Sequence, residues 1–598
     1  MNLSNLKIWN FRKFGDNASF DLEKPHLDLN FTEGINVLIG ENDSGKSAII
    51  DSIKLALKTH SYEWFRLDWD DFYVGSNRLR IELRFEKFLD DEAKNFTEWL
   101  GWNGEGDNAE PYLRLIYDTK RNLEDQYIYP TEIKAGVDEI GYQLTAEARE
   151  YLKTTYLKPL RDAKSELIPR KNSRLTQILQ GHEAFKGKDQ DHLLVELFQD
   201  FNEHVAKYFE GTDKDGAALT GENLKGKELK EEIDKFIQAF YSRDKESNFG
   251  VLGNNLKNIL EKLELSIKDE LNPGLGTLNR LFMASELLHL QKKIWNGLRL
   301  GLIEELEAHL HPQAQMQIIE ALQNEKNIQL ILTTHSPNLA SKLKLENLVI
   351  CNDNNAFPMG AAYTKLDSDN YKFLEKFLDT TKANLFFAKG VILVEGWAEE
   401  ILIPSIAKAI GINLTEKGVS IVNIGNTGFD HYSKIYIRKE EPYMNIPIAV
   451  ITDSDIREYE KDGDDFVKRN EDTIQLETQA AIDFNETRSE QSIKYYTAPN
   501  WTLEYSLFKS TSLTSTLQSV CKSIHSGTDW DTDFEKTMAI KLIDKNRKLN
   551  KTEIAYRLAT AIDEDLQKTP DERTINIDKD NDDSIKYLIQ AIRYAAGN

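Results

Sequence analysis

The sequence predicts an α/β protein with two separate sheets, a helical insertion within the first sheet-containing unit and a helical extension after the second. Its 598 residues have room for three or four units of roughly 150 residues each. Charged sequence with the apolar spacing of helices fills residues 166–268, which predicts the insertion. Apolar runs typical of buried strands recur at residues 35–39, 300–303, 327–334, 391–394 and 445–452.

The composition excludes several classes of protein. Apolar residues make up 40% of the chain, so wholesale disorder is excluded. Cys351 and Cys521 are too few for a disulfide framework and fit a reducing cytosol. No apolar run reaches the length of about 18 residues that a membrane span needs, so we expect a cytoplasmic protein. The net charge of −24 by itself argues against a nucleic-acid partner, because phosphates repel an acidic surface.

The first predicted strand, residues 35–39, runs into the sequence GENDSGKS, and a helical pattern follows. This is a complete G-x-x-x-x-G-K-S loop in its expected context, so it predicts a nucleotide site. The loop turns its backbone N–H groups towards phosphate, the lysine reaches the β- and γ-phosphates, and the serine hydroxyl binds Mg²⁺. The predicted nucleotide-binding residues are Gly40, Asn42, Gly45, Lys46 and Ser47.

Two further strands supply partners for this loop. The run 300–303 ends in Glu304 and Glu305, of which the first is expected to hold Mg²⁺ through water and the second to polarise the attacking water. The run 327–334 ends at His335, which we expect to sense the γ-phosphate. The pair His309 and His311 is better explained by a helix-entry turn before Pro312 than by a metal site.

The sequence between the loop and the acidic strand is longer than a compact nucleotide-binding domain needs. Residues 76–131 alternate between apolar and polar, which predicts the strands of a β-rich lobe. Residues 145–167 have a helical pattern. We expect the charged stretch 166–268 to be a helical insertion that serves as an arm or a dimerisation element. It has no long array of heptad repeats, so a long coiled coil is not expected.

A second set of acidic residues follows the later strands. The run 391–394 ends at Glu395, with Glu399 on the helix that follows, and the run 445–452 ends in Asp453 and Asp455. So many carboxylates in one place are costly unless divalent cations neutralise them, which predicts bound Mg²⁺ or Mn²⁺. A pair of such ions can clamp the attacking water and the leaving oxygen of a phosphodiester.

The first half of the chain resembles the ABC-type ATPases of the RecF/SMC kind. The resemblance rests on NFRKF (10–14), the GENDSGKS loop, IEELEAHLHPQ (303–313) and TTHSP (333–337). It implies that ATP with Mg²⁺ binds and that two heads pair across the nucleotide. Leu306 replaces the usual proline, and the signature-like segment 272–290, with Gly274 and Gly276, lacks the standard Ser-Gly-Gly core. Nucleotide binding is therefore a firmer expectation than fast hydrolysis.

The second half resembles a Toprim domain, with Glu395 as its glutamate and Asp453/Asp455 as its Asp-x-Asp pair. An ATPase followed by Toprim resembles the OLD (overcoming lysogenization defect) endonucleases. That likeness implies that Glu399 and Glu504 join the metal ligands and that Lys551 lies near the scissile phosphate, although Thr552 replaces the family's usual glycine. The nuclease subunit of the Gabija anti-phage system has the same layout, which implies a UvrD-like helicase partner if this chain is of that type.

The leading hypothesis is an ATP-regulated, metal-dependent endonuclease that cuts double-stranded DNA in anti-phage defence as a homodimer or tetramer. The alternatives are a RecF-like DNA scaffold with an inactive Toprim domain and a defence effector that cleaves RNA or tRNA. The expected domains are residues 1–165 and 269–380 (ATPase), 166–268 (insertion), 381–510 (Toprim) and 511–598 (helical extension).

Local charge qualifies the argument from net charge. The segment 158–174 is basic and either contacts DNA or forms a solvated helix face, and its cationic residues are Lys158, Arg161, Lys164, Arg170, Lys171 and Arg174. The segment 561–583 is strongly acidic, and we expect a surface loop there or a contact for a basic partner.

Overall fold

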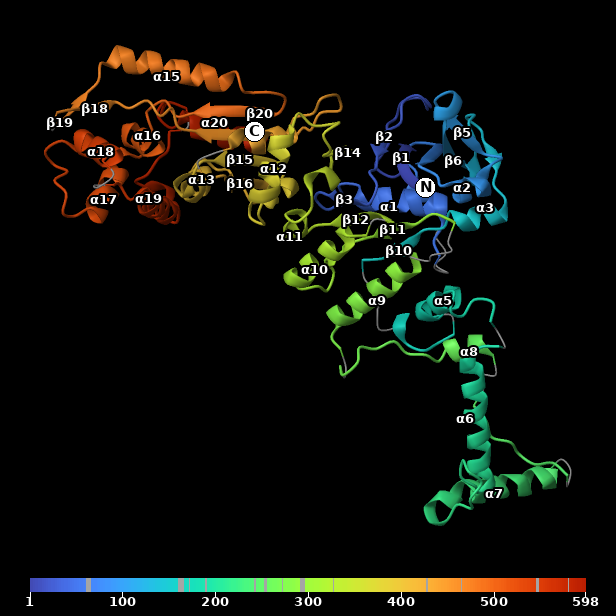
Figure 1. The fold of residues 1–598 in the computed structure, drawn as a ribbon. Helices are drawn as coiled ribbons and strands as arrows, with labels where there is room; N and C mark the ends of the chain where they lie inside the picture. Colours follow the sequence, from blue (N-terminus) through green and yellow to red (C-terminus); the bar gives the residue numbers. More distant parts are fainter. Residues whose placement is uncertain are drawn as a thin grey trace.

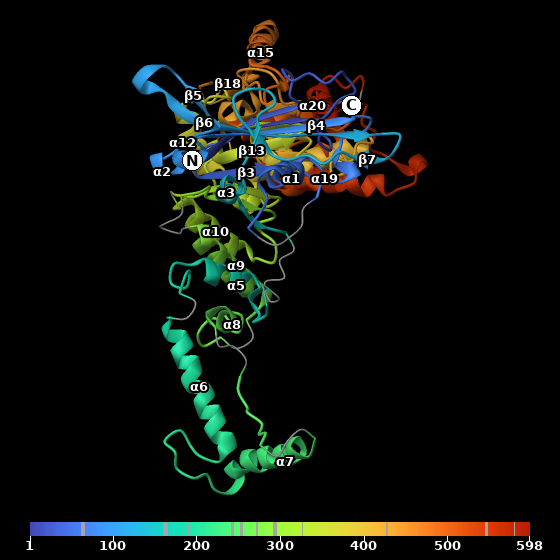
Figure 2. The same ribbon diagram turned by 90° about the vertical axis from the view of Figure 1, so that its right-hand side faces the viewer.

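The computed structural model covers residues 1–598 and describes all of them except 61–65, 160–165, 172, 189–190, 241–243, 252–254, 271–272, 291–295, 326, 426–427, 464, 545–547, 579 and 598. Two sheet-containing bodies lie side by side, and a narrow helical segment extends away from the first of them (Figure 1). In the view turned by 90° the same segment still projects from the main mass (Figure 2). The insertion is therefore an arm that is separate from both sheet-containing bodies.

The N-terminal lobe is an antiparallel sheet in the order β2-β1-β4-β6-β8-β9, with β5 and β7 also paired to β6. Its strands are β1 (Asn2–Trp9), β2 (Leu27–Asn30), β4 (Arg78–Glu86), β5 (Leu100–Asn103), β6 (Glu110–Asn122), β7 (Tyr127–Ile128), β8 (Lys134–Ala135) and β9 (Tyr142–Gln143). The alternating pattern of residues 76–131 follows from this sheet, because one face of β4 and β6 is buried against the core and the other is solvated. The prediction of a β-rich lobe is confirmed.

A second sheet, in the order β10-β11-β12-β3-β13-β14, carries the nucleotide loop. Its strands are β3 (Ile35–Ile39), β10 (Thr155–Leu157), β11 (Leu300–Ile303), β12 (Gln329–Thr334), β13 (Leu348–Asn352) and β14 (Asn355–Pro358). Strand β3 pairs in parallel with β12 and β13, and β11 pairs in parallel with β12. The carboxyl ends of β3, β11 and β12 therefore meet at one edge, and α1 (Lys46–Leu57) begins there.

The prediction of a helix over residues 145–167 is wrong for the middle of this segment. Helix α3 ends at Tyr151, and residues 155–157 form β10, which pairs in parallel with β11. The local pattern is helical, but the β-branched Thr154 and Thr155 and the open edge of β11 favour a strand. Tertiary pairing outweighs local propensity at this position.

The insertion contains α5 (Arg174–Gly181), α6 (Leu193–Glu210), α7 (Lys225–Phe240) and α8 (Leu256–Leu260), and α9 (Leu275–Leu290) leads back into the sheet. Helices α6 and α7 form the far end of the arm (Figures 1 and 2). The remaining helices of the first body are α2 (Asp90–Ala93), α3 (Ala146–Tyr151), α10 (Pro312–Gln323) and α11 (Pro337–Ala340). Helix α10 begins at Pro312 with His311 as its cap, as predicted from the HLHP sequence.

The second body has a four-stranded parallel sheet in the order β16-β15-β17-β20. Its strands are β15 (Gly390–Val394), β16 (Val419–Asn423), β17 (Ile448–Thr452) and β20 (Ile493–Thr497), with a separate hairpin of β18 (Tyr459–Asp462) and β19 (Asp465–Lys468). Its helices are α12 (Ser368–Phe377), α13 (Trp397–Ala409), α14 (Phe429–Ser433), α15 (Glu471–Glu486), α16 (Leu503–Lys509), α17 (Thr514–Ile524), α18 (Phe534–Ile543), α19 (Lys551–Leu566) and α20 (Lys586–Ala595).

One hydrophobic core joins the two bodies. It contains side chains from the nucleotide-binding sheet, such as Val37 and Leu332, and others from the second sheet, such as Leu393 and Val450. Leu385, which is fully buried, belongs to the same core and lies in the segment just before β15. The two sheets are therefore packed against shared side chains rather than merely tethered. Within the part of the chain that the structure describes, no helix is both long enough and apolar enough to cross a bilayer.

Candidate functional site

The nucleotide loop closes around its own lysine. Gly45 caps α1 with φ 104°, a conformation that glycine adopts without strain. The Lys46 ammonium is buried and donates hydrogen bonds to the carbonyls of Gly40 (2.9 Å) and Glu41 (2.5 Å). Burial lowers the pKa of Lys46. A bound phosphate would offer this ammonium a charged acceptor in place of two neutral carbonyls, which favours anion binding.

Ser47 and Glu304 meet across the sheet although they are far apart in the sequence. The Ser47 hydroxyl donates to Oε2 of Glu304 (2.8 Å), and the Tyr156 hydroxyl donates to its Oε1 (2.8 Å). Burial raises the pKa of Glu304. A hydroxyl and a carboxylate oxygen at this distance are suitable ligands for Mg²⁺, so the chain offers the metal a ready position beside the phosphate loop.

Glu305 and His335 line an open hollow of about 640 Å³ together with Lys46 and Ser47. Glu305 has φ 45°, an unusual backbone conformation of the kind that clusters at functional sites, and its N–H donates to the Thr333 hydroxyl (3.0 Å). The pKa of His335 is lowered by burial and then by the charge of Lys46. The structure thus brings together the residues of the predicted nucleotide site.

The sequence analysis missed Glu307. Its carboxylate accepts hydrogen bonds from the His335 N–H (2.6 Å) and the Thr334 hydroxyl (2.8 Å), so it ties the end of β12 to the segment after β11. The signal was the third acid in the sequence EELE directly after a predicted strand. Glu307 therefore sets the position of His335 beside the hollow.

Glu395 and Asp453 lie at the carboxyl ends of the neighbouring parallel strands β15 and β17. Oε1 of Glu395 accepts hydrogen bonds from the Thr452 hydroxyl (2.6 Å) and the Asp453 N–H (3.4 Å). Parallel strands place the residues that follow them at one edge of the sheet, and this edge is where α/β folds bind ligands. Thr452 therefore fixes one oxygen of Glu395 and leaves the other available.

Three further predicted residues reach the same place from helices. Glu399 lies in the first turn of α13, Glu504 in the first turn of α16 and Lys551 at the start of α19. The Lys551 ammonium forms an ion pair with Oε2 of Glu504 (2.8 Å), which also accepts a hydrogen bond from the Thr502 hydroxyl (3.0 Å). The structure thus brings together Glu395, Glu399, Asp453, Glu504 and Lys551, which we call the acid cluster.

The acid cluster carries more negative charge than its one lysine neutralises. Burial, followed by the charges of Glu504 and Glu395, raises the pKa of Glu399 to about 7. Burial, followed by the charge of Glu504, holds the pKa of Asp453 well above its usual range. For Lys551, burial acts to lower the pKa, but the charges of Glu504 and Asp453 outweigh it and the pKa is raised.

These side chains suit a divalent cation by chemistry, since carboxylate oxygens are the ligands that Mg²⁺ and Mn²⁺ prefer. Within the described ranges, however, no three acidic, histidine or cysteine side chains are already grouped so that they could hold a metal ion. The residues therefore fit a metal site whose final arrangement depends on the cation itself.

Asp455 is placed differently from the other predicted acids. The residue is exposed and adopts φ 59°, and its N–H donates to the carbonyl of Trp501 (3.0 Å), which has φ 37°. Two strained residues held to one another mark a fixed turn beside the acid cluster. Asp455 is thus an exposed residue two positions after Asp453, and the structure shows no contact between its carboxylate and the acid cluster within the described residues.

Two expectations about charged segments need correction. Arg174 does not contribute to a basic surface, because it is buried in a bidentate ion pair with Glu286 (2.5 and 2.7 Å) that joins α5 to α9. Arg161 and Lys164 lie outside the described residues. The acidic segment 561–583 is not wholly a surface loop, because Asp565 and Asp582 are buried and accept backbone hydrogen bonds that fold the segment.

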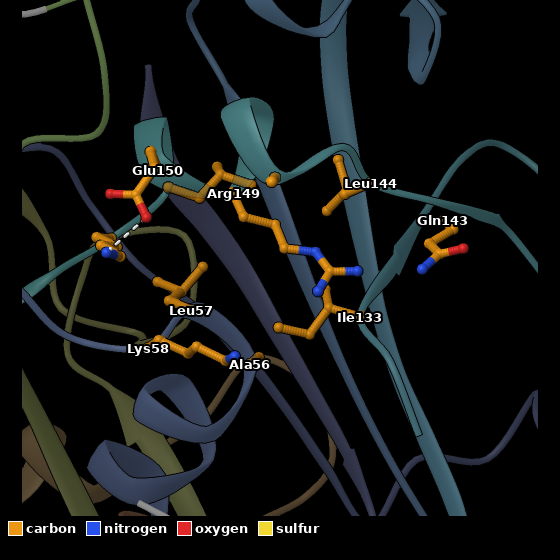
Figure 3. Close-up of a pocket in the computed structure, with 11 residues that line it drawn as sticks. Ala56, Leu57, Lys58, Ile133, Gln143, Leu144, Arg149 and Glu150 are labelled. Atoms are coloured by element: carbon orange, nitrogen blue, oxygen red, sulfur yellow. Dashed lines mark ion pairs between the residues drawn. The ribbon is translucent and has the colours of Figure 1, made fainter. Parts of the chain in front are cut away.

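Another hollow, of about 360 Å³, lies away from both sites, between the end of α1 and α3. Arg149 extends into it from α3 towards Ile133, and Lys153 pairs with Glu150 at its edge (2.7 Å) (Figure 3). None of the predicted site residues lines this hollow. It is therefore separate from the chemistry described above.

Comparison with known proteins identifies both halves of the chain. Residues 1–340, more than half of its length, match the AAA ATPase domain family. The chain belongs to this family. Residues 386–455 of this AAA ATPase match the overcoming lysogenization defect protein-like TOPRIM domain. The predicted fold class, an ATPase head followed by a Toprim domain, is thereby confirmed.

Two curated relatives of this AAA ATPase are similar over most of its length. One is "Endonuclease GajA" of Bacillus cereus (strain HuB5-5), 23% identical over 545 residues and covering 78% of each chain. The other is "OLD nuclease" of Thermus scotoductus (strain ATCC 700910 / SA-01), 22% identical over 455 residues, which cover 73% of this chain and 81% of the relative. Both relatives are named as nucleases.

Proposed function

We propose that this chain is a divalent-metal-dependent DNA endonuclease whose cleavage is regulated by ATP at its AAA ATPase domain, in anti-phage defence. The observation that carries the proposal is the convergence of Glu395, Glu399, Asp453 and Glu504 with Lys551 at one sheet edge. A scaffold would have no use for four converging carboxylates, two of them buried, whereas a cation-dependent hydrolase needs them. The names of the two relatives support the same reading.

The acid cluster supplies the residues of the proposed cleavage site. Glu395, Glu399, Asp453, Glu504 and the outer Asp455 would hold Mg²⁺ or Mn²⁺, which would supply an activated water and neutralise phosphate charge. Thr452 orients Glu395, and Thr502 orients Glu504. Lys551 can exchange its ion pair with Glu504 for a contact with the scissile phosphate, where its charge would stabilise the developing negative charge.

In the ATPase domain, the loop residues Gly40, Asn42 and Gly45 and the ammonium of Lys46 would bind the phosphates of ATP. Ser47 and Glu304 would hold its Mg²⁺, Glu305 would orient water, and His335 would face the γ-phosphate. One ion pair offers a route to the cleavage site: Glu41 of the loop pairs with Lys389 (3.3 Å), which directly precedes β15. A change in the loop on ATP binding would thus reach the strand that ends at Glu395.

The arm gives the chain a surface for self-association. Helix α6 exposes Leu193, Leu197 and Phe201 at helical spacing, and α7 exposes Phe236 and Phe240. Stripes of this kind on a projecting arm are typical of helix-pairing surfaces. We propose that they assemble a homodimer or tetramer. The proposal keeps the domains at 1–165 with 269–380, 166–268, 381–510 and 511–598, and it includes a UvrD-like helicase as partner if the system is of the Gabija type.

A plasmid assay tests this proposal. Supercoiled DNA is incubated with the protein and Mg²⁺ or Mn²⁺, with and without ATP, beside Glu395→Ala and Lys46→Ala. We expect the wild type to nick or cut the plasmid, Glu395→Ala to leave it intact, and Lys46→Ala to lose its response to ATP. Intact plasmid under every condition, with wild type and Glu395→Ala alike, would refute DNA cleavage.

A further inference from the structure

The C-terminal helix α20 brings its first turn to the acid cluster. The helix packs against β15, β17 and α13, the elements that carry Glu395, Asp453 and Glu399. Its last residues lie over the start of β15, so closely that a Cβ on Gly390 would come within 2.0 Å of the Ala595 carbonyl. Because the end of α20 lies at the beginning of β15, the beginning of α20 lies towards the carboxyl end of the strand. The second residue of this helix is Tyr587.

The hydroxyl of Tyr587 is buried without a hydrogen-bond partner. The residue is 6% exposed, and among the described residues no group forms a hydrogen bond with its hydroxyl. Ser506, which approaches it, donates its own hydrogen bond to the carbonyl of Asn500 (3.0 Å). Buried hydroxyls almost always form a hydrogen bond. The unpaired hydroxyl of Tyr587 therefore suggests that it forms its hydrogen bond in another state of the site.

Three carboxylates of the acid cluster act electrostatically on this hydroxyl. The pKa of Tyr587 is raised first by burial and then by the negative charges of Asp453, Glu399 and Glu504, with Asp453 the strongest of the three. The phenol therefore keeps its proton and can act only as a neutral donor towards these carboxylates. With 6% of its surface exposed, the side chain is also too buried to contact substrate, so it is no nucleophile.

Building on the function proposed above, we propose that Tyr587 is a positioning residue of the cleavage site, whose hydroxyl donates a hydrogen bond to the Asp453 carboxylate when a divalent cation is bound. This bond would direct one oxygen of Asp453 to Tyr587 and the other to the cation. Partners of this kind hold metal ligands in orientation, and their removal typically weakens metal binding by about 10- to 100-fold.

The affinity for Mn²⁺ distinguishes this positioning role of Tyr587 from a purely structural role. If the ring only fills the core, Tyr587→Phe removes an orphan hydroxyl and leaves metal binding unchanged. If the hydroxyl serves the site, Tyr587→Phe leaves the metal-free protein as stable as before, or more stable, yet binds Mn²⁺ more weakly. Tyr436 is a matched control: it is also buried (1% exposed), but its hydroxyl is already paired with the Leu385 carbonyl (2.8 Å).

The test is calorimetric titration of the metal-free, full-length protein with Mn²⁺, together with thermal unfolding without metal. Binding that remains in Glu395→Ala is subtracted. We expect Tyr587→Phe to lower the Mn²⁺ affinity about tenfold at an unchanged or higher Tm, and Tyr436→Phe to lower the Tm with unchanged affinity. Equal Mn²⁺ affinity in wild type and Tyr587→Phe would overturn the inference while leaving the proposed function intact. Absence of Mn²⁺ binding to the wild type would overturn both.

Discussion

The nucleotide site and the acid cluster are both suited to bind an ion or a charged group, but their charged side chains have different surroundings. In the nucleotide site two of the charged groups already have neutral partners: Lys46 donates to loop carbonyls, and Glu304 accepts from Ser47 and Tyr156. In the acid cluster, Glu399 is buried and Asp453 is partly buried beside other acids, and burial and the charges of those acids raise both pKa values. A site built on backbone and hydroxyl groups is formed before its ligand arrives, whereas a site built on like charges is completed by its cation.

The largest expected effect separates these two sites by activity. Replacing a predicted metal ligand, in Glu395→Ala or Asp453→Ala, should lower DNA cleavage by about 100-fold or more, because a ligand matters at least as much as the groups that orient it. ATP binding, measured with a fluorescent nucleotide, should stay within about twofold of wild type. Cleavage at the wild-type rate in both variants would remove the acid cluster from the chemistry.

The second effect concerns stability and pH in the metal-free protein. The folded-state pKa of Glu399, about 7, lies above its ordinary value of 4.5, so the folded chain binds the proton more tightly than the unfolded chain. Wild-type stability should therefore fall as pH rises from about 4.5 through about 7. Glu399→Gln lacks this loss and should be more stable than wild type at pH 8 by on the order of 1–3 kcal/mol, but not at pH 5.

Urea unfolding at both pH values measures this difference. The control variant is Asp118→Asn. Burial acts to raise the pKa of Asp118, but hydrogen bonds from Arg78 and Arg80 outweigh it and the pKa is lowered. This ionised carboxylate therefore stabilises the fold, and its removal should destabilise the protein at pH 8. If Glu399→Gln and Asp118→Asn change stability in the same direction at pH 8, the raised pKa of Glu399 does not come from its place in the acid cluster.

The third effect is smaller and lies within the nucleotide site. Tyr156→Phe removes one hydrogen bond to Glu304 and keeps the ring, which packs over the Lys54 ammonium (3.6 Å). A single hydrogen bond to a carboxylate contributes about 1 kcal/mol, so we expect Mg²⁺·ATP affinity to fall about fivefold. Titration with ATP in EDTA is the control: there the difference between wild type and variant should disappear, because Glu304 acts on the metal and not on the phosphates.

The contrast also explains what the sequence could predict. The strand, loop and helix at 35–57 are specified by neighbouring residues, so these three elements could be predicted from the sequence. Strand β10 was missed because its pairing with β11 depends on residues far along the chain. Tyr587 was missed because one tyrosine in an amphipathic helix carries no local signal, and only the packing of α20 across the sheet brings it to the acids. Arg174 was assigned to a basic surface because its ion-pair partner, Glu286, is distant in the sequence.

The smallest expected effect tests the connection between the two sites. Lys389 and Glu41 form an ion pair of 3.3 Å with both side chains well exposed, so Lys389→Ala should change the free energy of unfolding by less than about 1 kcal/mol. If this contact carries the state of the loop to β15, the variant should nonetheless reduce the effect of ATP on the cleavage rate by about two- to threefold. The control is Lys408→Ala, since Lys408 pairs with Asp563 at the same 3.3 Å and with similar exposure, but this pair joins α13 to α19 and not to the nucleotide loop. Cleavage rates with and without ATP should differ between the two variants although their stabilities do not. An equal ATP response in both would mean that the shared hydrophobic core, and not this ion pair, joins nucleotide binding to cleavage.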